Sequence, residues 1–175
     1  MKFNYLACKA IYLHEMDRFR RTLLQSLLSP VLSTSLYFIV FGSVIGGYVE
    51  NIDGISYGSY IVPGLLMLTL LTQSISNTSF GIFFPKFNGT IYEILAAPIS
   101  TFEIVLAFVG AGASKTLIVG VVIFITATFF VEVEVKYPLL MIFLLLLVAF
   151  TFALFGFLIG LISSNFEQMS IIPTL

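Results

Sequence analysis

The fold is decided by long apolar stretches, of which the clearest is PLLMIFLLLLVAFTFALFGFLIGLISSNF at residues 138–166. These 29 residues contain no acidic or basic side chain, and the same is true of the 24 residues 26–49 and the 32 residues 54–85. A helix of about 20 apolar residues spans the hydrocarbon core of a bilayer, which is ~30 Å thick. The sequence therefore predicts an all-α integral membrane protein.

The composition supports this prediction and excludes several functions. Of the 175 residues, 59% are hydrophobic and only 10% are charged, whereas soluble domains have about 25% charged residues. Little remains for a soluble domain, so any catalytic domain is expected on another chain. Cys8 and His14 are the only residues of their types, which excludes an internal disulfide and metal sites rich in cysteine or histidine. The net charge of −1 and the lack of a basic stripe indicate no nucleic-acid partner.

Hydrophobic periodicity divides the chain into segments. Residues 2–24 are predicted to form an amphipathic helix on the membrane surface, because Phe3, Leu6, Ala7, Ala10 and Leu13 recur at helical spacing. Four transmembrane spans are predicted at about 26–49, 59–84, 104–131 and 139–163. The apolar residues 169–175 are predicted to begin a fifth span. A half-span would leave backbone groups unpaired in lipid, so the sequence is expected to be a fragment of a longer protein or a truncated product.

The distribution of basic residues predicts the orientation. Five lysines and arginines lie in the N-terminal segment and Lys86 lies in the loop 85–103, whereas the opposite side has only Lys136. Basic residues near span ends accumulate on the cytoplasmic side. We therefore expect a multi-pass protein of the inner (plasma) membrane whose N-terminus and 85–103 loop face the cytoplasm.

The loop 85–103 carries the clearest local signals. Residues 90–93 (TIYE) and 100–103 (STFE) have the capping-box pattern of a helix start. Pro98 disfavours helical geometry in the residue before it, so a short helix is predicted at 91–97. Its partly apolar surface consists of Ile91, Tyr92, Ile94 and Leu95, beside Glu93. From local sequence this helix is either a contact for a partner protein or a capped loop helix lying on the membrane.

Short motifs recur along the whole chain. They are RFRR at 18–21, SP at 29–30, LY at 36–37, VFG at 40–42, YGSYIVPGLLM at 57–67, NTS at 77–79 and KFNGTIYEILAAPIS at 86–100. In this order they resemble the permease subunit of a type 2 ABC exporter (ABC-2 family). Pro63-Gly64 and the LAAP sequence at 95–98 are the most specific of these features.

The resemblance implies a function. Such permeases have six spans, so this chain departs from the family by lacking the last two, and residues 1–175 would form a single ABC-2 type transmembrane domain. They work as homodimers or heterodimers in membrane lipid, each half docked on a nucleotide-binding subunit that holds ATP and Mg. Residues 91–97 would be the coupling helix that contacts this ATPase, and residues 2–24 the interfacial connecting helix. The chain itself would bind no cofactor, have no catalytic residue, and help to export a glycan, a lipid-linked oligosaccharide, a drug or another small molecule.

Lys115 is the only charged residue well inside a predicted span. Such residues are expensive in lipid and usually face protein or water, so Lys115 could line the translocation path together with Tyr37 and Phe41. Alternatively, Lys115 lies low in the bilayer and extends its ammonium group toward the headgroups. The predicted third span is ~42 Å long at 1.5 Å per residue, which favours the second arrangement. Aromatic residues in spans mostly pack or face lipid, which favours these roles over the translocation path for Tyr37 and Phe41.

Two glycine pairs have the spacing that lets helices approach closely. Gly42 and Gly46 form one pair, and Gly156 and Gly160 form the other. Either pair can pack within the subunit or at a dimer seam. Residues 110–116 (GAGASKT) resemble a phosphate-binding loop but have Val109 at the first glycine position and Ser114 before the lysine, so no ATP site is predicted.

Two other classes of function were weighed against the exporter. An integral membrane enzyme needs clustered acids, histidines or metal ligands, and the predicted spans contain none. A passive channel or an assembly scaffold has no need of a capped cytoplasmic helix. The sequence therefore favours an ATP-driven exporter.

Overall fold

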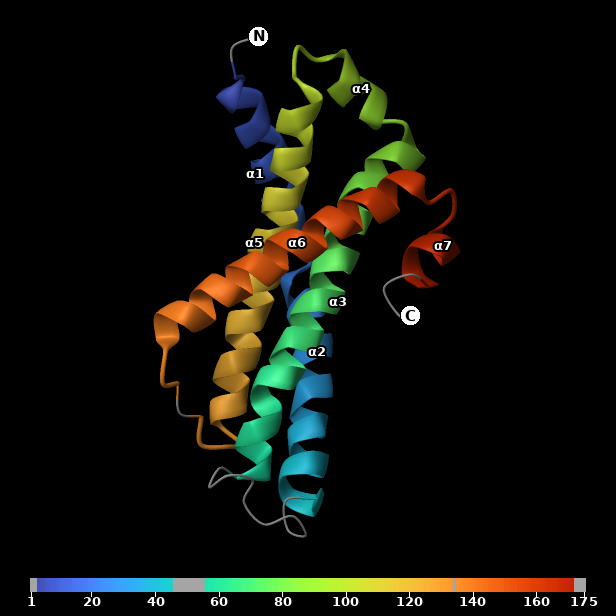
Figure 1. Cartoon of the computed structure of the whole chain (residues 1–175). Coiled ribbons are helices and arrows are strands. Elements are labelled where there is room, and N and C mark those ends of the chain that lie inside the picture. Colours follow the sequence, from blue (N-terminus) through green and yellow to red (C-terminus); the bar gives the residue numbers. More distant parts are fainter. Residues whose placement is uncertain (1–2, 46–55, 134, 172–175) are drawn as a thin grey trace.

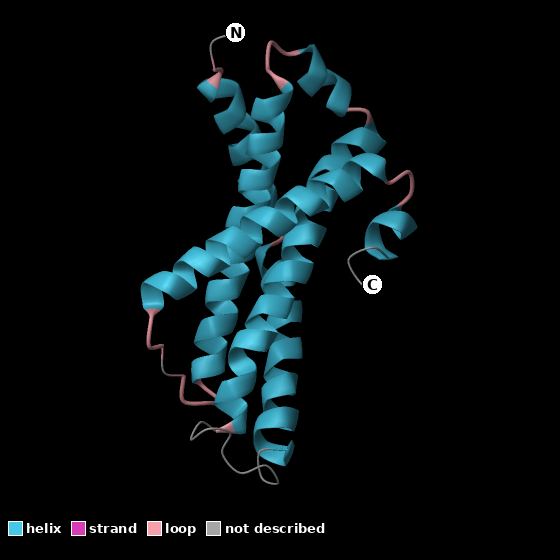
Figure 2. Ribbon diagram, in the orientation of Figure 1, coloured by secondary structure: helices cyan, strands magenta, loops and turns pink. Residues whose placement is uncertain are grey.

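The computed structural model describes residues 3–45, 56–133 and 135–171, and in these residues it contains helices and no strand (Figure 2). The α-helices, labelled in Figure 1, are α1 (Tyr5–Arg21), α2 (Leu23–Tyr37), α3 (Tyr57–Asn88), α4 (Ile91–Ala96), α5 (Thr101–Thr128), α6 (Pro138–Ile162) and α7 (Phe166–Ile171). A π-helix, Phe38–Ile45, continues α2. The prediction of an all-α protein is confirmed.

Four helical segments in the described residues are long and apolar enough to cross a membrane. They are Leu23–Phe41, α3, α5 and α6, which confirms the predicted number of complete spans. The largest difference in length concerns α3, whose 32 residues correspond to about 48 Å at 1.5 Å per residue. Since a bilayer core needs only ~30 Å, α3 extends beyond it. The helix ends at Gly89, whose φ of 80° lies in the left-handed region that glycine adopts without strain.

The N-terminal helix α1 lies along the first half of α5, and the two run parallel. Tyr12 donates a hydrogen bond to Ser114 (3.0 Å), and Lys115 donates one to Glu15 (2.7 Å). The predicted apolar face of α1 points away from α5, because Phe3, Leu6 and Leu13 are exposed. This face is available to lipid, while the location of the helix at the membrane surface stays a prediction. The helix is interrupted at Thr22, and α2 begins at the next residue.

Helix α3 is the centre of the bundle, and α6 crosses over it (Figure 1). The crossing is close because α6 presents glycines to the backbone of α3. A Cβ atom added at Gly156 would lie 2.5 Å from the carbonyl oxygen of Ile75, and one added at Gly160 would lie 2.5 Å from that of Ser79. This glycine pair therefore meets another helix of the same chain.

The C-terminal end of α6 is held by the C-terminal end of α3. Lys86 donates hydrogen bonds from Nζ to the carbonyl oxygens of Leu161 (2.6 Å) and Ser163 (2.9 Å). Just beyond, Phe166 of α7 contacts the ring of Phe83, with 4.8 Å between centroids. Helix α7 begins three residues before the predicted start of a fifth span, and residues 172–175 of that prediction lie outside the described residues.

Candidate functional site

Helix α4 projects from one end of the bundle between α3 and α5 (Figure 1). Ile91 and Ile94 are half-buried and pack against the core cluster that includes Ile82, Ile104 and Phe108. On the other side of α4, the exposed fractions of Tyr92 and Leu95 are 73% and 62%, and Glu93 is exposed too. The five predicted coupling residues thus divide into two that anchor α4 and three that it displays.

The local signals around α4 were partly right. The predicted capping box at residues 90–93 is wrong, because Thr90 is itself helical and its hydroxyl donates to the carbonyl oxygen of Pro85 (3.4 Å). The left-handed Gly89 turns the chain directly into α4, so no side-chain cap forms. Ala97 is extended before Pro98, with φ −72° and ψ 151°, as expected for a residue before proline. Helix α4 therefore ends at Ala96, one residue before the predicted end at 97.

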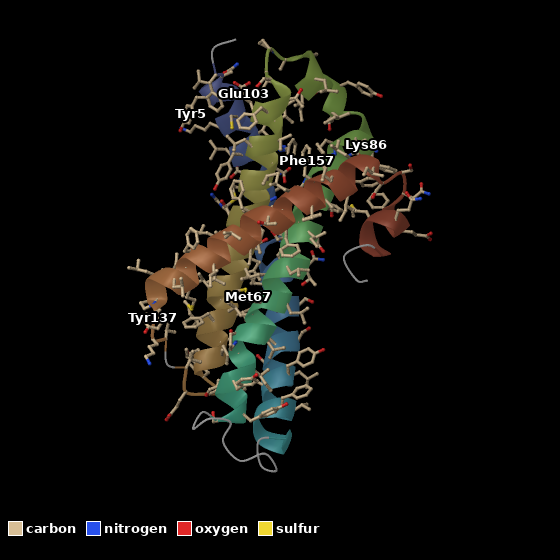
Figure 3. All side chains as sticks on the ribbon, viewed as in Figure 1. Tyr5, Met67, Lys86, Glu103, Tyr137 and Phe157 are labelled. Carbon is tan, nitrogen blue, oxygen red and sulfur yellow. The ribbon has the colours of Figure 1, made fainter. Side chains whose placement is uncertain are left out.

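The second predicted capping box, at the start of α5, is confirmed. Ser100 Oγ accepts from the backbone N–H of Glu103 (3.3 Å), and the Glu103 carboxylate accepts from that of Ser100 (2.7 Å). The same carboxylate also accepts from the backbone N–H of Asn4 at the start of α1. The side chain of Asn4 in turn donates to the carbonyl oxygen of Pro98 (3.3 Å). These bonds fasten the chain after α4 to both α1 and α5, and Figure 3 shows Glu103 beside Tyr5 at this end of the molecule.

Lys115 is buried rather than directed toward the headgroups, so the interpretation that it extends out of the protein is wrong. Its side chain is 3% exposed, and its Nζ lies 2.7 Å from Glu15 Oε2. The same carboxylate oxygen lies 2.8 Å from Arg18 Nη2, one turn further along α1. The physical reason is that a carboxylate beside the ammonium group replaces the water that it would otherwise have to reach. We call Glu15, Arg18 and Lys115 the charge cluster.

A cavity of about 910 Å³ lies between the α1–α2 junction and the middle of α3. Both cations of the charge cluster are on its wall, together with residues of α1, α2, α3 and α7. The polar lining side chains are Thr22, Gln25, Ser26, Thr72, Ser76, Asn77 and Ser79, and the apolar ones are Phe19, Leu68, Leu71, Phe80 and Met169.

The structure brings only one of the three predicted path residues to this cavity. Lys115 lines it, whereas Tyr37 and Phe41 do not. These two aromatic rings stack on each other with centroids 5.8 Å apart, and Tyr37 is about half exposed. Of the first glycine pair, Gly46 lies outside the described residues, as do the surroundings of Gly42.

The sequence analysis missed Glu15 and Arg18 as site residues. Ile11, Glu15 and Phe19 are spaced four residues apart and so share one face of α1. Glu15 and Phe19 are both buried. A carboxylate in line with apolar residues, in a chain with one lysine inside a span, is the signal that could have identified the pair.

Known proteins are similar to this chain over almost its whole length. The sequence pattern of a family described as ABC-2 type transporter matches residues 7–175. The chain is 36% identical over 174 residues to a protein called inner membrane transport permease YadH in Escherichia coli strain K12, with 99% of this chain and 68% of that protein covered. Identity and coverage are the same for the YadH proteins of Escherichia coli O157:H7 and Shigella flexneri. No solved structure matches the chain.

Proposed function

The chain belongs to the ABC-2 type transporter family, and from this premise we propose that it is the transmembrane subunit of an ATP-driven exporter. It is a multi-pass membrane protein and a transporter component. In our proposal residues 1–175 form one transmembrane domain, which pairs with a second permease subunit. ATP and Mg are bound and hydrolysed on a separate nucleotide-binding subunit, and the substrate leaves the cytoplasm.

The observation that carries this proposal is the exposure of α4. Tyr92 and Leu95 are large, and most of their surface is accessible, although the helix that holds them is fixed to the core through Ile91 and Ile94. A firmly anchored helix that displays an aromatic and an aliphatic side chain has the character of an interface hot spot. We propose that these two residues seat in the nucleotide-binding subunit, with Glu93 at the rim of the contact.

The hydrogen bonds around α4 support its role in transmitting force. Its N-terminal side continues directly from α3 through Gly89, and its C-terminal side is fastened to α1 and α5 through Glu103. A displacement of α4 by the ATPase therefore moves three helices that carry or border the charge cluster.

The coupling role is tested with Tyr92→Ala/Leu95→Ala. We expect the variant to insert into the membrane at the wild-type level, while co-purification of the ATPase and ATP-dependent transport fall together. Loss of such anchors typically costs ~2 kcal/mol or more each. The matched control is Tyr137→Ala/Leu139→Ala, since these residues are 65% and 83% exposed and Tyr137 lies at the far side of the molecule (Figure 3). Normal ATPase binding and transport by the α4 variant would refute the proposal.

The cytoplasmic orientation has its own test, because Cys8 is the only thiol in the chain. A membrane-impermeant maleimide should label Cys8 in inside-out vesicles and leave it unlabelled in intact cells. A cysteine placed at Tyr137 in a Cys8→Ser background should show the opposite pattern. Labelling of Cys8 in intact cells would put α4 on the wrong side of the membrane for an ATPase.

A further inference from the structure

The charge cluster contains more positive than negative charge. Glu15 contributes one carboxylate, and the same oxygen of that carboxylate serves both Lys115 and Arg18. The sum of the three side chains is +1. A buried ion pair adds little to stability, and replacing it with apolar residues is often neutral or stabilising. A second cation on the same carboxylate oxygen therefore calls for an explanation other than holding the fold together.

The donors of the two cations are mostly unused by the protein. Among the described residues Glu15 is the only hydrogen-bond partner of the Lys115 ammonium, which has three N–H groups. The Arg18 guanidinium has five, and its Nη2 is the atom that meets Glu15. Arg18 also lies over the ring of Phe80, 5.3 Å from the centroid. Both side chains line the cavity and Glu15 does not. Arg18 is 26% exposed and Lys115 only 3%, so Arg18 carries the positive charge that is accessible from the cavity.

The remaining walls suit a molecule with a polar and an apolar end. Hydroxyl and amide groups such as those of Thr22, Gln25 and Asn77 surround the cavity and can bond to phosphate or hydroxyl oxygens. Leu68 and Phe80 line it as well, yet they are 57% and 38% exposed. Since both belong to a membrane-spanning helix, the apolar side of the cavity is open toward lipid or a second subunit.

We propose that this cavity binds the phosphate group of an anionic amphipathic molecule, with Arg18 and Lys115 as its counter-ions. The hydroxyl and amide groups hold the polar end, and the apolar chain leaves across Leu68 and Phe80. Arg18 makes the principal contact, because it is 26% exposed, always charged and able to hold two phosphate oxygens at once. This inference rests on the transport role, for which it names the class of substrate.

The test is binding of defined lipids to the purified permease in dodecyl maltoside, an uncharged detergent. Dioleoyl phosphatidylglycerol is compared with dioleoyl phosphatidylcholine, which has the same chains and no net charge. Bound molecules are counted by native mass spectrometry, and affinity is taken from the shift in melting temperature during titration. We expect saturable binding of phosphatidylglycerol, at least about tenfold tighter than that of phosphatidylcholine, as for one charge-assisted contact.

Four variants decide whether the charge cluster is the binding site. Arg18→Gln should weaken phosphatidylglycerol binding about tenfold or more. Arg18→Lys keeps the charge but loses the contact with two phosphate oxygens, so its affinity should lie between those of wild type and Arg18→Gln. Arg20→Gln removes the same charge from an exposed position two residues away and should have no effect. Glu15→Gln should tighten binding, because the carboxylate that competes for both cations is gone. If the charge cluster only stabilised the fold, Glu15→Gln would leave phosphatidylglycerol binding unchanged or weaken it.

The outcomes are separable. Competition by inorganic phosphate, abolished in Arg18→Gln, would support the site and identify the free anion as its source; phosphatidylglycerol binding without such competition identifies the headgroup. Equal binding of the two lipids, or wild-type binding by Arg18→Gln, would overturn the proposal. If Arg18→Gln does not fold, Glu15→Gln decides, and unchanged or weaker binding refutes it. No ATPase is present, so failure here leaves the coupling test intact, and failure of coupling leaves this result intact.

Discussion

Two buried carboxylates join α1 to α5, and they are satisfied in different ways. Glu103 of α5 accepts backbone N–H groups from Ser100 and Asn4. Glu15 of α1 meets the cations Lys115 and Arg18. Both residues are almost fully buried, at 3% and 2% exposed. The first carboxylate uses neutral donors that α-helix starts leave unpaired in any case. The second gathers charges, which a fold alone does not require. The difference separates a structural fastening from a site that can bind something else.

The largest effect is expected from Glu15→Leu, which leaves Lys115 buried beside Arg18 without a carboxylate. Removing one partner of a buried ion pair typically costs about 3–5 kcal/mol. The double variant Glu15→Leu/Lys115→Leu should recover most of that loss, because it removes both charges of the pair. The measurement is the melting temperature of the purified protein in detergent. If the double variant is no more stable than Glu15→Leu, the loss of stability does not come from leaving Lys115 without its carboxylate partner.

A smaller effect is expected from Glu103→Ala, which removes the acceptor for two backbone N–H groups. Backbone donors left without a partner destabilise the fold, so the melting temperature should fall below that of wild type. Glu103→Gln keeps one acceptor oxygen and should lose less. The control is Ser100→Ala, which removes only the cap and should cost about 1 kcal/mol. If Glu103→Ala is as stable as wild type, the contact between α1 and α5 at this end does not hold the two helices together.

The smallest effect concerns the thiol of Cys8, whose pKa is influenced by the negative charge of Glu103. Burial, and secondarily the negative charge of Glu103, raise the pKa of the Cys8 thiol above its usual range. Because the thiolate is the reactive form, maleimide labelling at pH 7 should be slow and should accelerate as the pH rises. Glu103→Gln should speed labelling at pH 7 by lowering that pKa, whereas Glu15→Gln should not. Equal rates in wild type and Glu103→Gln would show that Glu103 is not close enough to act on Cys8.

What could be predicted from the sequence was whatever neighbouring residues decide among themselves. The spans follow from uninterrupted apolar runs, and the start of α5 follows from Ser100 and Glu103, three residues apart. The same pattern at Thr90 makes no cap hydrogen bond, because the backbone of Thr90 has helical angles (φ −66°, ψ −14°) and its hydroxyl donates to the carbonyl oxygen of Pro85 instead. No local pattern pairs Glu15 with Lys115, which are 100 residues apart. The cavity lies between the α1–α2 junction and α3, and these helices pack on α5, so it too could not be anticipated from local sequence.

The glycines of α6 have a mechanical consequence. The contact with α3 is made by backbone atoms of Ile75 at Gly156, and by the backbone of Ser79 together with the side chain of Ile82 at Gly160. Backbone atoms have no rotamers to change when helices slide. Cores and interfaces built this tightly switch between discrete arrangements rather than deforming smoothly. We therefore expect α3 and α6 to move together as one rigid body during a transport cycle. Any bending must then occur elsewhere. The interruption at Thr22 between α1 and α2 lies beside the cavity and can act as a hinge. Bending at Thr22 would alter the volume of the cavity without changing the contact between α3 and α6.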